Sequence, residues 1–98
     1  MKSEAKVQSE IIKYIKSHGG WVIKTIRVNE NGCPDLLACI DGQFYGIEVK
    51  AEKFSKDPYK QTSPYQKKQL AGIESAGGIS ICAATLAQVK EIIPIKEV

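Results

Sequence analysis

Residues 32–50 read GCPDLLACIDGQFYGIEVK, two apolar runs joined by a single turn. The dipeptide Asp41-Gly42 between the runs is typical of a tight β-hairpin, so we expect strands over residues 35–40 and 43–50. Apolar side chains occupy both faces of this hairpin. That distribution predicts a sheet that is covered on both sides rather than one with a face open to water.

The turn at Asp41-Gly42 also sets the register of the hairpin. Counting outward from a two-residue or a four-residue turn places Asp35 directly opposite Glu48, whereas a three-residue turn does not. Directly opposed residues have Cβ atoms roughly 4.5–5.5 Å apart, and like charges at that spacing are destabilising. A divalent cation would remove this repulsion and prefers oxygen ligands, so the pair indicates a metal site.

Alternation along a strand puts Lys50 and Gly46 on the same face as Glu48, with the main-chain carbonyl of Val49 between them. An ammonium group at Lys50 can orient a water molecule or stabilise charge that grows on a phosphate. Gly46 is expected to leave room for a substrate backbone above the carboxylates. The other interpretation is an exposed Glu48–Lys50 ion pair with Asp35 as a turn residue, but the opposed register and the apolar surroundings favour a site.

The elements outside this hairpin follow from periodicity, caps and breakers. We expect a helix over 3–18, a strand over 21–28, a segment without periodicity over 51–62, a helix from Ser63-Pro64 to Gly77-Gly78, a strand over 79–83, and a helix from Thr85 through Ile92. The order is therefore αβββαβα in one domain over residues 1–98. It predicts an α/β fold with a mixed central sheet flanked by helices.

Two further residues are candidates for the same site. Glu10 borders the apolar stripe of the first helix, where it would reach the metal or its surroundings, although an exposed helical glutamate explains it equally well. Gln66 lies on the inward side of its helix, four residues before Leu70. Because Ser63-x-x-Gln66 is also a capping box, and one amide is not expected to satisfy both roles fully, both interpretations stay open.

The segment after the second hairpin strand is suited to hold nucleic acid. Its lysines, with those of the following helix, are expected to contact phosphates, while its aromatic rings would stack on unpaired bases. These candidates are Lys53, Lys56, Lys60, Lys67, Lys68, Phe54 and Tyr59. A formal net charge of +3 is compatible with an anionic partner. A solvated, mobile loop remains the alternative for residues 51–62.

The combined motif resembles the signature of PD-(D/E)XK nucleases: Asp35 matches the PD position, and Glu48-Val49-Lys50 matches ExK. With Glu10 upstream and the motif SPYQ at 63–66 downstream, the whole chain resembles a stand-alone virus-type replication-repair nuclease (VRR-NUC) domain.

The resemblance implies a DNA endonuclease that hydrolyses phosphodiester bonds with Mg²⁺ or Mn²⁺. Asp35, Glu48 and the carbonyl of Val49 would bind the metal, and Lys50 would assist the attacking water. Single-domain members of this family are similar to Holliday-junction resolvases and act as homodimers, which implies branched DNA as the substrate. Trp21 and the final helix are candidates for the dimer interface.

Composition excludes several other classes. The three cysteines, Cys33, Cys39 and Cys82, form no CxxC pair and accompany a single histidine, so we expect reduced, mostly buried thiols rather than a zinc site. The polar start and the lack of a long apolar run favour a cytoplasmic protein of a bacterial cell or phage-infected host. A nuclease of flap, nicking or restriction type, or a non-catalytic nucleic-acid-binding module, remain as alternative functions.

Overall fold

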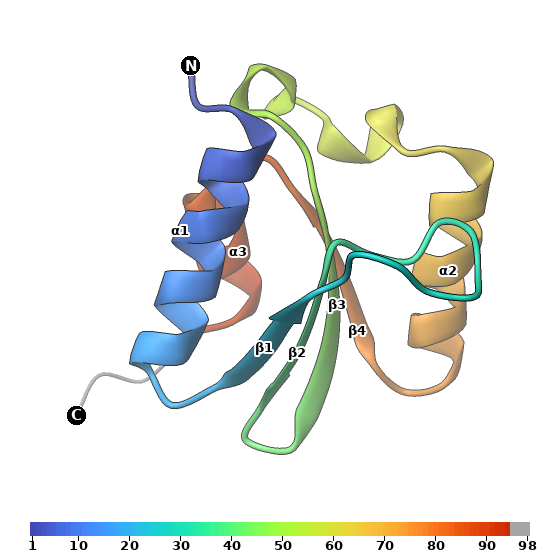
Figure 1. Cartoon of the computed structure of the whole chain (residues 1–98), viewed down its shortest axis with the longest axis horizontal. Coiled ribbons are helices and arrows are strands. Elements are labelled where there is room, and N and C mark those ends of the chain that lie inside the picture. Colours follow the sequence, from blue (N-terminus) through green and yellow to red (C-terminus); the bar gives the residue numbers. More distant parts are fainter. Residues whose placement is uncertain (95–98) are drawn as a thin grey trace.

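The computed structural model describes residues 1–94, which form a four-stranded sheet between helices (Figure 1). The elements are α1 (Glu4–Ser17), β1 (Trp21–Lys24), β2 (Leu36–Ile40), β3 (Gln43–Val49), the 3₁₀ helices η1 (Glu52–Phe54) and η2 (Pro58–Gln61), α2 (Pro64–Ser75), β4 (Ile79–Ala83) and α3 (Leu86–Ile92). The predicted α/β fold and the order αβββαβα are confirmed.

The sheet is mixed, and its strands lie in the order β1-β2-β3-β4. β1, β2 and β3 are antiparallel neighbours, whereas β4 runs parallel to β3 after the crossover through α2. Asp41 and Gly42 both have positive φ values, 51° and 79°, which is the backbone that a tight hairpin turn requires. The pairs Ile40–Gln43 and Leu36–Ile47 confirm the predicted register.

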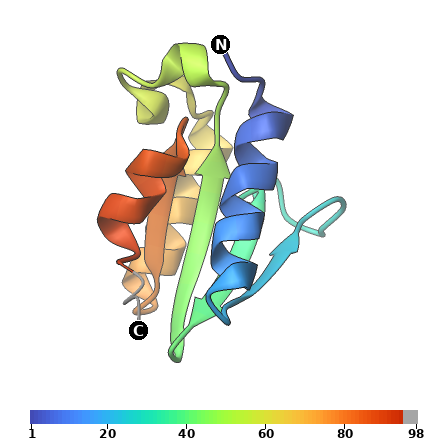
Figure 2. The same ribbon diagram turned by 90° about the vertical axis from the view of Figure 1, so that its left-hand side faces the viewer.

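Helices cover the two faces of the sheet unequally. α1 and α3 lie together on one face, which Figure 2 views directly, and α2 lies on the other. The face under α1 and α3 holds the hydrophobic core, to which α1 contributes Val7, Ile11 and Ile15, and α3 contributes Val89. Ile47 and Val49 of β3 are fully buried against them. The opposite face, under α2, therefore carries the polar and charged side chains of the sheet, such as Glu48.

The first strand is shorter than predicted, because it ends at Lys24 rather than at residue 28. β2 begins only at Leu36, after Pro34, so the residues beyond Lys24 have no strand to pair with. The amide of Thr25 donates to the Asp35 carbonyl at 2.8 Å, and the chain then leaves the sheet. Residues 25–28 are rich in β-branched types, but a strand also needs a hydrogen-bonding partner.

Residues 51–62 are not an irregular loop but two short 3₁₀ helices with specific anchors. The Asp57 side chain caps η2, and the Gln88 amide donates to the Ser55 carbonyl at 2.8 Å. At the start of the segment, the Glu52 carboxylate accepts from the Lys2 amide at 2.7 Å. Both the N-terminus and the α3 region therefore hold this segment in place.

Two further predictions concern the cysteines and membrane-spanning helices. Cys33, Cys39 and Cys82 are free thiols, but each is half-buried rather than mostly buried. Within residues 1–94, no helix combines the length and the apolar character that crossing a membrane requires.

Candidate active site

Two carboxylates lie together on the face of the sheet that α2 covers. Glu48 is in β3, and Asp35 stands immediately before β2, one step beyond the Leu36–Ile47 pair. The Asp35 Oδ2 atom accepts a hydrogen bond from the Val49 amide at 2.8 Å, which fixes its side chain across the hairpin. Glu48 is only 2% exposed. The predicted juxtaposition of Asp35 and Glu48 is therefore present.

Lys50 is held beside these carboxylates. Its Nζ atom lies 3.2 Å from Glu48 Oε2, and the side chains of Lys50 and Glu48 are 13% and 3% exposed. The ion pair is thus not the exposed pair that the alternative interpretation required. A buried ammonium at this position keeps a positive charge within the site rather than in the solvent.

Gln66 makes both sets of contacts that its sequence position indicated, the capping box and the hydrogen bonds to the site. Its Oε1 atom accepts from the Ser63 amide at 2.9 Å, which completes the capping box of α2, and from Lys50 Nζ at 3.2 Å. Its Nε2 atom donates to Glu48 Oε2 at 2.9 Å. The expectation that one amide could not serve both was wrong, because an amide oxygen accepts two hydrogen bonds while its nitrogen donates elsewhere.

The positive charge of Lys50 does not fully balance the two carboxylates. Burial first, and the Asp35 carboxylate second, raise the pKa of Glu48 to about 7, although Lys50 partly opposes both effects. The buried Oε1 atom of Glu48 has no hydrogen-bond partner among the described residues. An orphaned carboxylate oxygen next to a second carboxylate fits a hard divalent cation, which would satisfy the oxygen and neutralise the repulsion.

The acidic side chains alone do not complete a coordination sphere. Among residues 1–94, no cluster of three or more histidine, cysteine, aspartate or glutamate side chains is placed to hold a metal ion. The main-chain carbonyl of Val49 is the third metal ligand that was predicted from the sequence. Mg²⁺ usually binds through one or two carboxylates and completes its coordination with water and phosphate oxygens, so two carboxylates suit it.

The structure does not bring Glu10 to this cluster. Glu10 lies on α1, which covers the other face of the sheet, and its Oε2 atom pairs with Lys2 Nζ at 2.9 Å. Its side chain is 24% exposed.

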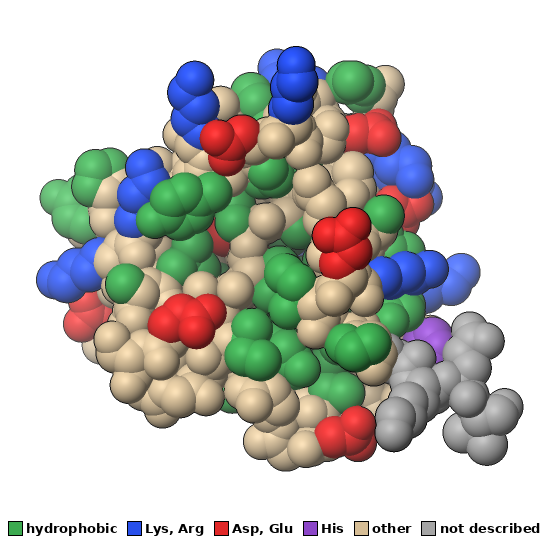
Figure 3. Space-filling model, turned by 180° about the vertical axis from the view of Figure 1, so that it is seen from behind, with side chains coloured by type: hydrophobic (Ala, Val, Ile, Leu, Met, Phe, Trp, Pro, Cys, Tyr) green, Lys and Arg blue, Asp and Glu red, His purple; other side chains and the backbone are tan. Residues whose placement is uncertain are grey.

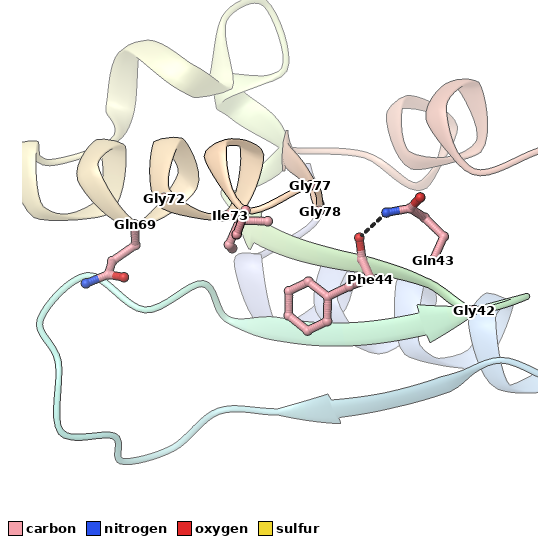
Figure 4. Close-up of a pocket in the computed structure, with 9 residues that line it drawn as sticks. Gly42, Gln43, Phe44, Gln69, Gly72, Ile73, Gly77 and Gly78 are labelled. Atoms are coloured by element: carbon pink, nitrogen blue, oxygen red, sulfur yellow. Dashed lines mark hydrogen bonds between the residues drawn. The ribbon is translucent and has the colours of Figure 1, made fainter.

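The interpretation of Gly46 was also wrong. A Cβ atom at Gly46 would collide with Cδ1 of Ile73, so the space above this glycine is filled by α2 and is not open to a substrate. A cavity of about 510 Å³ does lie beside Ile73, between α2 and the hairpin (Figure 4). Phe44, Ile73 and several glycines line it together with two glutamines, and its lining includes no charged side chain. The cavity therefore offers no acidic or basic side chain to a reaction.

The predicted DNA-binding residues surround a basic surface above the site. Lys53, Lys56 and Lys60 are exposed and line a shallow pocket of about 280 Å³ in the segment 51–62. Basic side chains gather at the top of the molecule in Figure 3, the end at which this segment lies in Figure 1. Lys68 of α2 is exposed as well.

Two of the lysines lie over aromatic rings. Lys53 Nζ is 5.1 Å from the ring centroid of Phe54, and Lys67 Nζ is 5.2 Å from that of Tyr59. The Tyr59 side chain is 51% exposed. Charge and exposed aromatic surface are thus combined in one place.

Sequence reasoning missed a second surface next to the carboxylates. Residues 25–33 form a loop. Residues 25–28 and 30–33 line a cavity of about 360 Å³ together with Asp35. Arg27 in this loop is exposed and is the only arginine of the chain. This single arginine among thirteen lysines was a signal in the sequence, but the expected strand over 21–28 concealed it.

No family model matches the sequence, and no curated protein matches it. Two solved structures do resemble the chain. One, described as a VRR_NUC domain, has 23% sequence identity and a TM-score of 0.76 over 99% of this chain and 100% of its own. The other, described as a VRR_NUC domain protein, has 18% identity and a TM-score of 0.69 over 94% and 85% of the two chains. The chain therefore has the fold of VRR_NUC domains over nearly its whole length.

Proposed function

We propose that this chain is a metal-dependent DNA endonuclease of the PD-(D/E)XK superfamily, with the VRR-NUC type of active site. The observation that carries the proposal is the Glu48 carboxylate, which is buried beside Asp35 with one oxygen unpartnered. A protein that only binds phosphates gains nothing from two adjacent carboxylates, one of which, Glu48, is buried. The VRR_NUC fold, found over nearly the whole chain, supports the same assignment.

Asp35, Glu48 and the Val49 carbonyl are the groups that would hold Mg²⁺ or Mn²⁺. Bound there, the cation would polarise a phosphodiester and lower the pKa of a water molecule enough for it to attack at neutral pH. Glu10 has no part in this proposal, because its carboxylate pairs with Lys2.

The chain's own residues prepare the site in two ways. Lys50 places an ammonium next to the carboxylates, where it stabilises negative charge that develops on the phosphate. Gln66 bonds to both Lys50 and Glu48 and is itself fixed by the capping box, so the three side chains hold one arrangement before substrate binds. This rigidity lowers the cost of orienting the reacting groups.

The basic segment 51–62 would bind the DNA backbone. Exchanging Lys53 and Lys56 for glutamate should weaken binding and flatten its dependence on salt, because fewer counterions are released. Substitution of Lys16 by glutamate, an exposed lysine of α1, is the matched control. A salt slope for the double variant equal to that of the wild type would refute this assignment.

The test of the function is cleavage of end-labelled DNA. Four-way junction, flap and linear duplex are incubated with Mg²⁺, Mn²⁺ or EDTA, using wild type, Asp35→Ala and, as a control, Glu91→Ala, which changes an exposed glutamate of α3. We expect metal-dependent cutting that falls at least about a hundredfold in Asp35→Ala and is unchanged in Glu91→Ala. Tight binding of DNA without cutting under any condition would instead favour a non-catalytic module.

We further propose that the substrate is branched DNA and that the chain acts as a homodimer. A four-way junction is nearly two-fold symmetric, so its resolution suits two identical sites. Trp21 on β1 and Ile92 on α3 are 52% and 44% exposed and are the apolar residues to test at an interface. Sedimentation should give a dimer at assay concentration; a monomer that cuts only linear or flapped DNA would keep the metal site and exclude the resolvase.

A further inference from the structure

The loop between β1 and β2, residues 25–33, has a base that is fixed to the active site. The Thr25 hydroxyl donates to the carbonyls of Pro34 and Asp35 at 2.7 and 3.2 Å, and the Thr25 amide donates to Asp35 at 2.8 Å. These hydrogen bonds fix the base of the loop to the backbone of Asp35, one of the two carboxylate residues of the site.

The far side of the loop is fixed to α2. The Gln69 amide donates to the Asn31 carbonyl at 3.2 Å. Gly32 has φ of 79°, and a Cβ there would collide with the backbone of Tyr65 and Gln66, so only glycine allows the loop to lie this close to the first turn of α2. The same turn follows directly from the basic segment 51–62. The loop and the basic segment thus border the carboxylates from two sides.

The first residues of this anchored loop, directly after its base at Thr25, present an unusual surface. Ile26 is 93% exposed and Val28 is 45% exposed, and Arg27 stands between them. Within residues 1–94, the Arg27 guanidinium has neither an ion pair nor a hydrogen bond. Nothing in the described chain covers Ile26 or Arg27, and both lie beside the proposed nuclease site. We therefore expect them to contact the DNA. Exposed apolar side chains such as isoleucine insert between stacked bases in other DNA-binding proteins. The guanidinium group of arginine binds a phosphate through two hydrogen bonds.

We propose that residues 26–28 form a second DNA-contacting element, in which Arg27 binds a backbone phosphate and Ile26 packs against unstacked bases at a branch point. This inference rests on the proposed DNA substrate. It predicts that the loop makes the protein bind branched DNA more tightly than linear DNA. The segment 51–62 contributes charge from one side of the site, and the loop contributes an apolar wedge from the other.

The test is equilibrium binding in EDTA, where no cutting occurs. Labelled four-way junction and linear duplex of the same sequence are titrated with wild type, Ile26→Ser and Ile26→Leu, with Phe44→Ser as a control on an exposed apolar residue of β3. We expect the junction-to-duplex affinity ratio to fall about tenfold in Ile26→Ser, because the buried apolar contact is lost, and to be retained in Ile26→Leu and Phe44→Ser.

Arg27→Ala gives a second, independent measurement. It should weaken binding to both DNAs and reduce the slope of log affinity against log salt by about 1, while Arg27→Lys should retain the slope. Lys16→Ala on α1 is the control for the loss of one exposed positive charge. Thermal unfolding of each variant shows that the fold is intact.

The outcomes separate this inference from the proposed nuclease function. Cutting by wild type together with an unchanged affinity ratio in Ile26→Ser would overturn the role of the loop alone. Binding of the junction by wild type, a reduced ratio in Ile26→Ser and no cutting with either metal would support the loop and overturn the nuclease. A wild type that binds no DNA at all would overturn both.

Discussion

The two faces of the sheet differ in what they bury. The face under α1 and α3 holds nearly all of the buried aliphatic side chains, and Gln8 is the one buried polar residue that α1 adds to it. On the face under α2, Leu70 is the one buried residue of that helix, and the sheet supplies Glu48 with Lys50 beside it. One face carries the hydrophobic stabilisation of the domain, and this allows the other to hold charged groups that cost free energy.

The contrast is sharpest between neighbouring residues of one strand. Ile47 is fully buried in the core, and Glu48, the next residue, is 2% exposed with an unpartnered oxygen on the opposite face. Strand alternation thus places a stabilising side chain and a destabilising one on consecutive residues. The comparison predicts that substitutions at these two positions affect stability in opposite directions.

The largest effect on stability is expected from the core face. Ile47→Ala should lower the free energy of unfolding by about 2–5 kcal/mol, since it removes buried methyl groups and leaves a cavity. Urea denaturation measures the change, with Ile92→Ala as the control at a half-exposed position. Equal losses in both variants would show that Ile47 is not part of a tightly packed core.

Gly46→Ala tests how closely α2 approaches the sheet. The added methyl meets Cδ1 of Ile73, so we expect a loss of about 1–3 kcal/mol, near the lower end because that atom is the tip of a side chain. Adding Ile73→Val, which removes Cδ1, should recover part of the loss in a double-mutant cycle. Simple additivity of the two substitutions would contradict the contact.

A smaller effect is expected from pH. In the folded protein the pKa of Glu48 is about 7, against an ordinary value of 4.5, so the folded state holds a proton that the unfolded state has released. Without divalent cations, stability should therefore fall as pH rises from about 4.5 through 7, by an amount on the order of 1 kcal/mol.

Glu48→Gln provides the comparison for this pH dependence, because it removes the titrating group. Unfolding midpoints in EDTA at pH 5, 6, 7 and 8 should fall more steeply for wild type than for the variant, and the variant should be the more stable at pH 8. Parallel curves would show that Glu48 is not the group whose ionisation destabilises the fold.

The sequence was sufficient to predict features that depend on local geometry. The turn at Asp41-Gly42 fixes the register, and alternation then places Asp35, Glu48 and Lys50 together without any knowledge of the rest of the chain. The helices followed from caps such as Ser63, whose capping box is present. The roles of these residues in catalysis stay predictions.

Features that depend on distant parts of the chain were not predictable in this way. Gly46 was interpreted without knowing that Ile73 fills the space above it. Residues 25–28 have the composition of a strand, but whether they pair depends on where β2 begins. The double role of Gln66 required the distance between α2 and β3, which no local pattern contains.

The central claim is that the carboxylates on the α2 face bind a divalent cation. The direct test is calorimetric titration of Mn²⁺ into wild type, Asp35→Asn and Glu48→Gln, with Glu91→Gln as the control. The account predicts binding to wild type and to Glu91→Gln, and an affinity at least about tenfold lower in both Asp35→Asn and Glu48→Gln. Equal binding by all four proteins, or no binding to wild type, would contradict it.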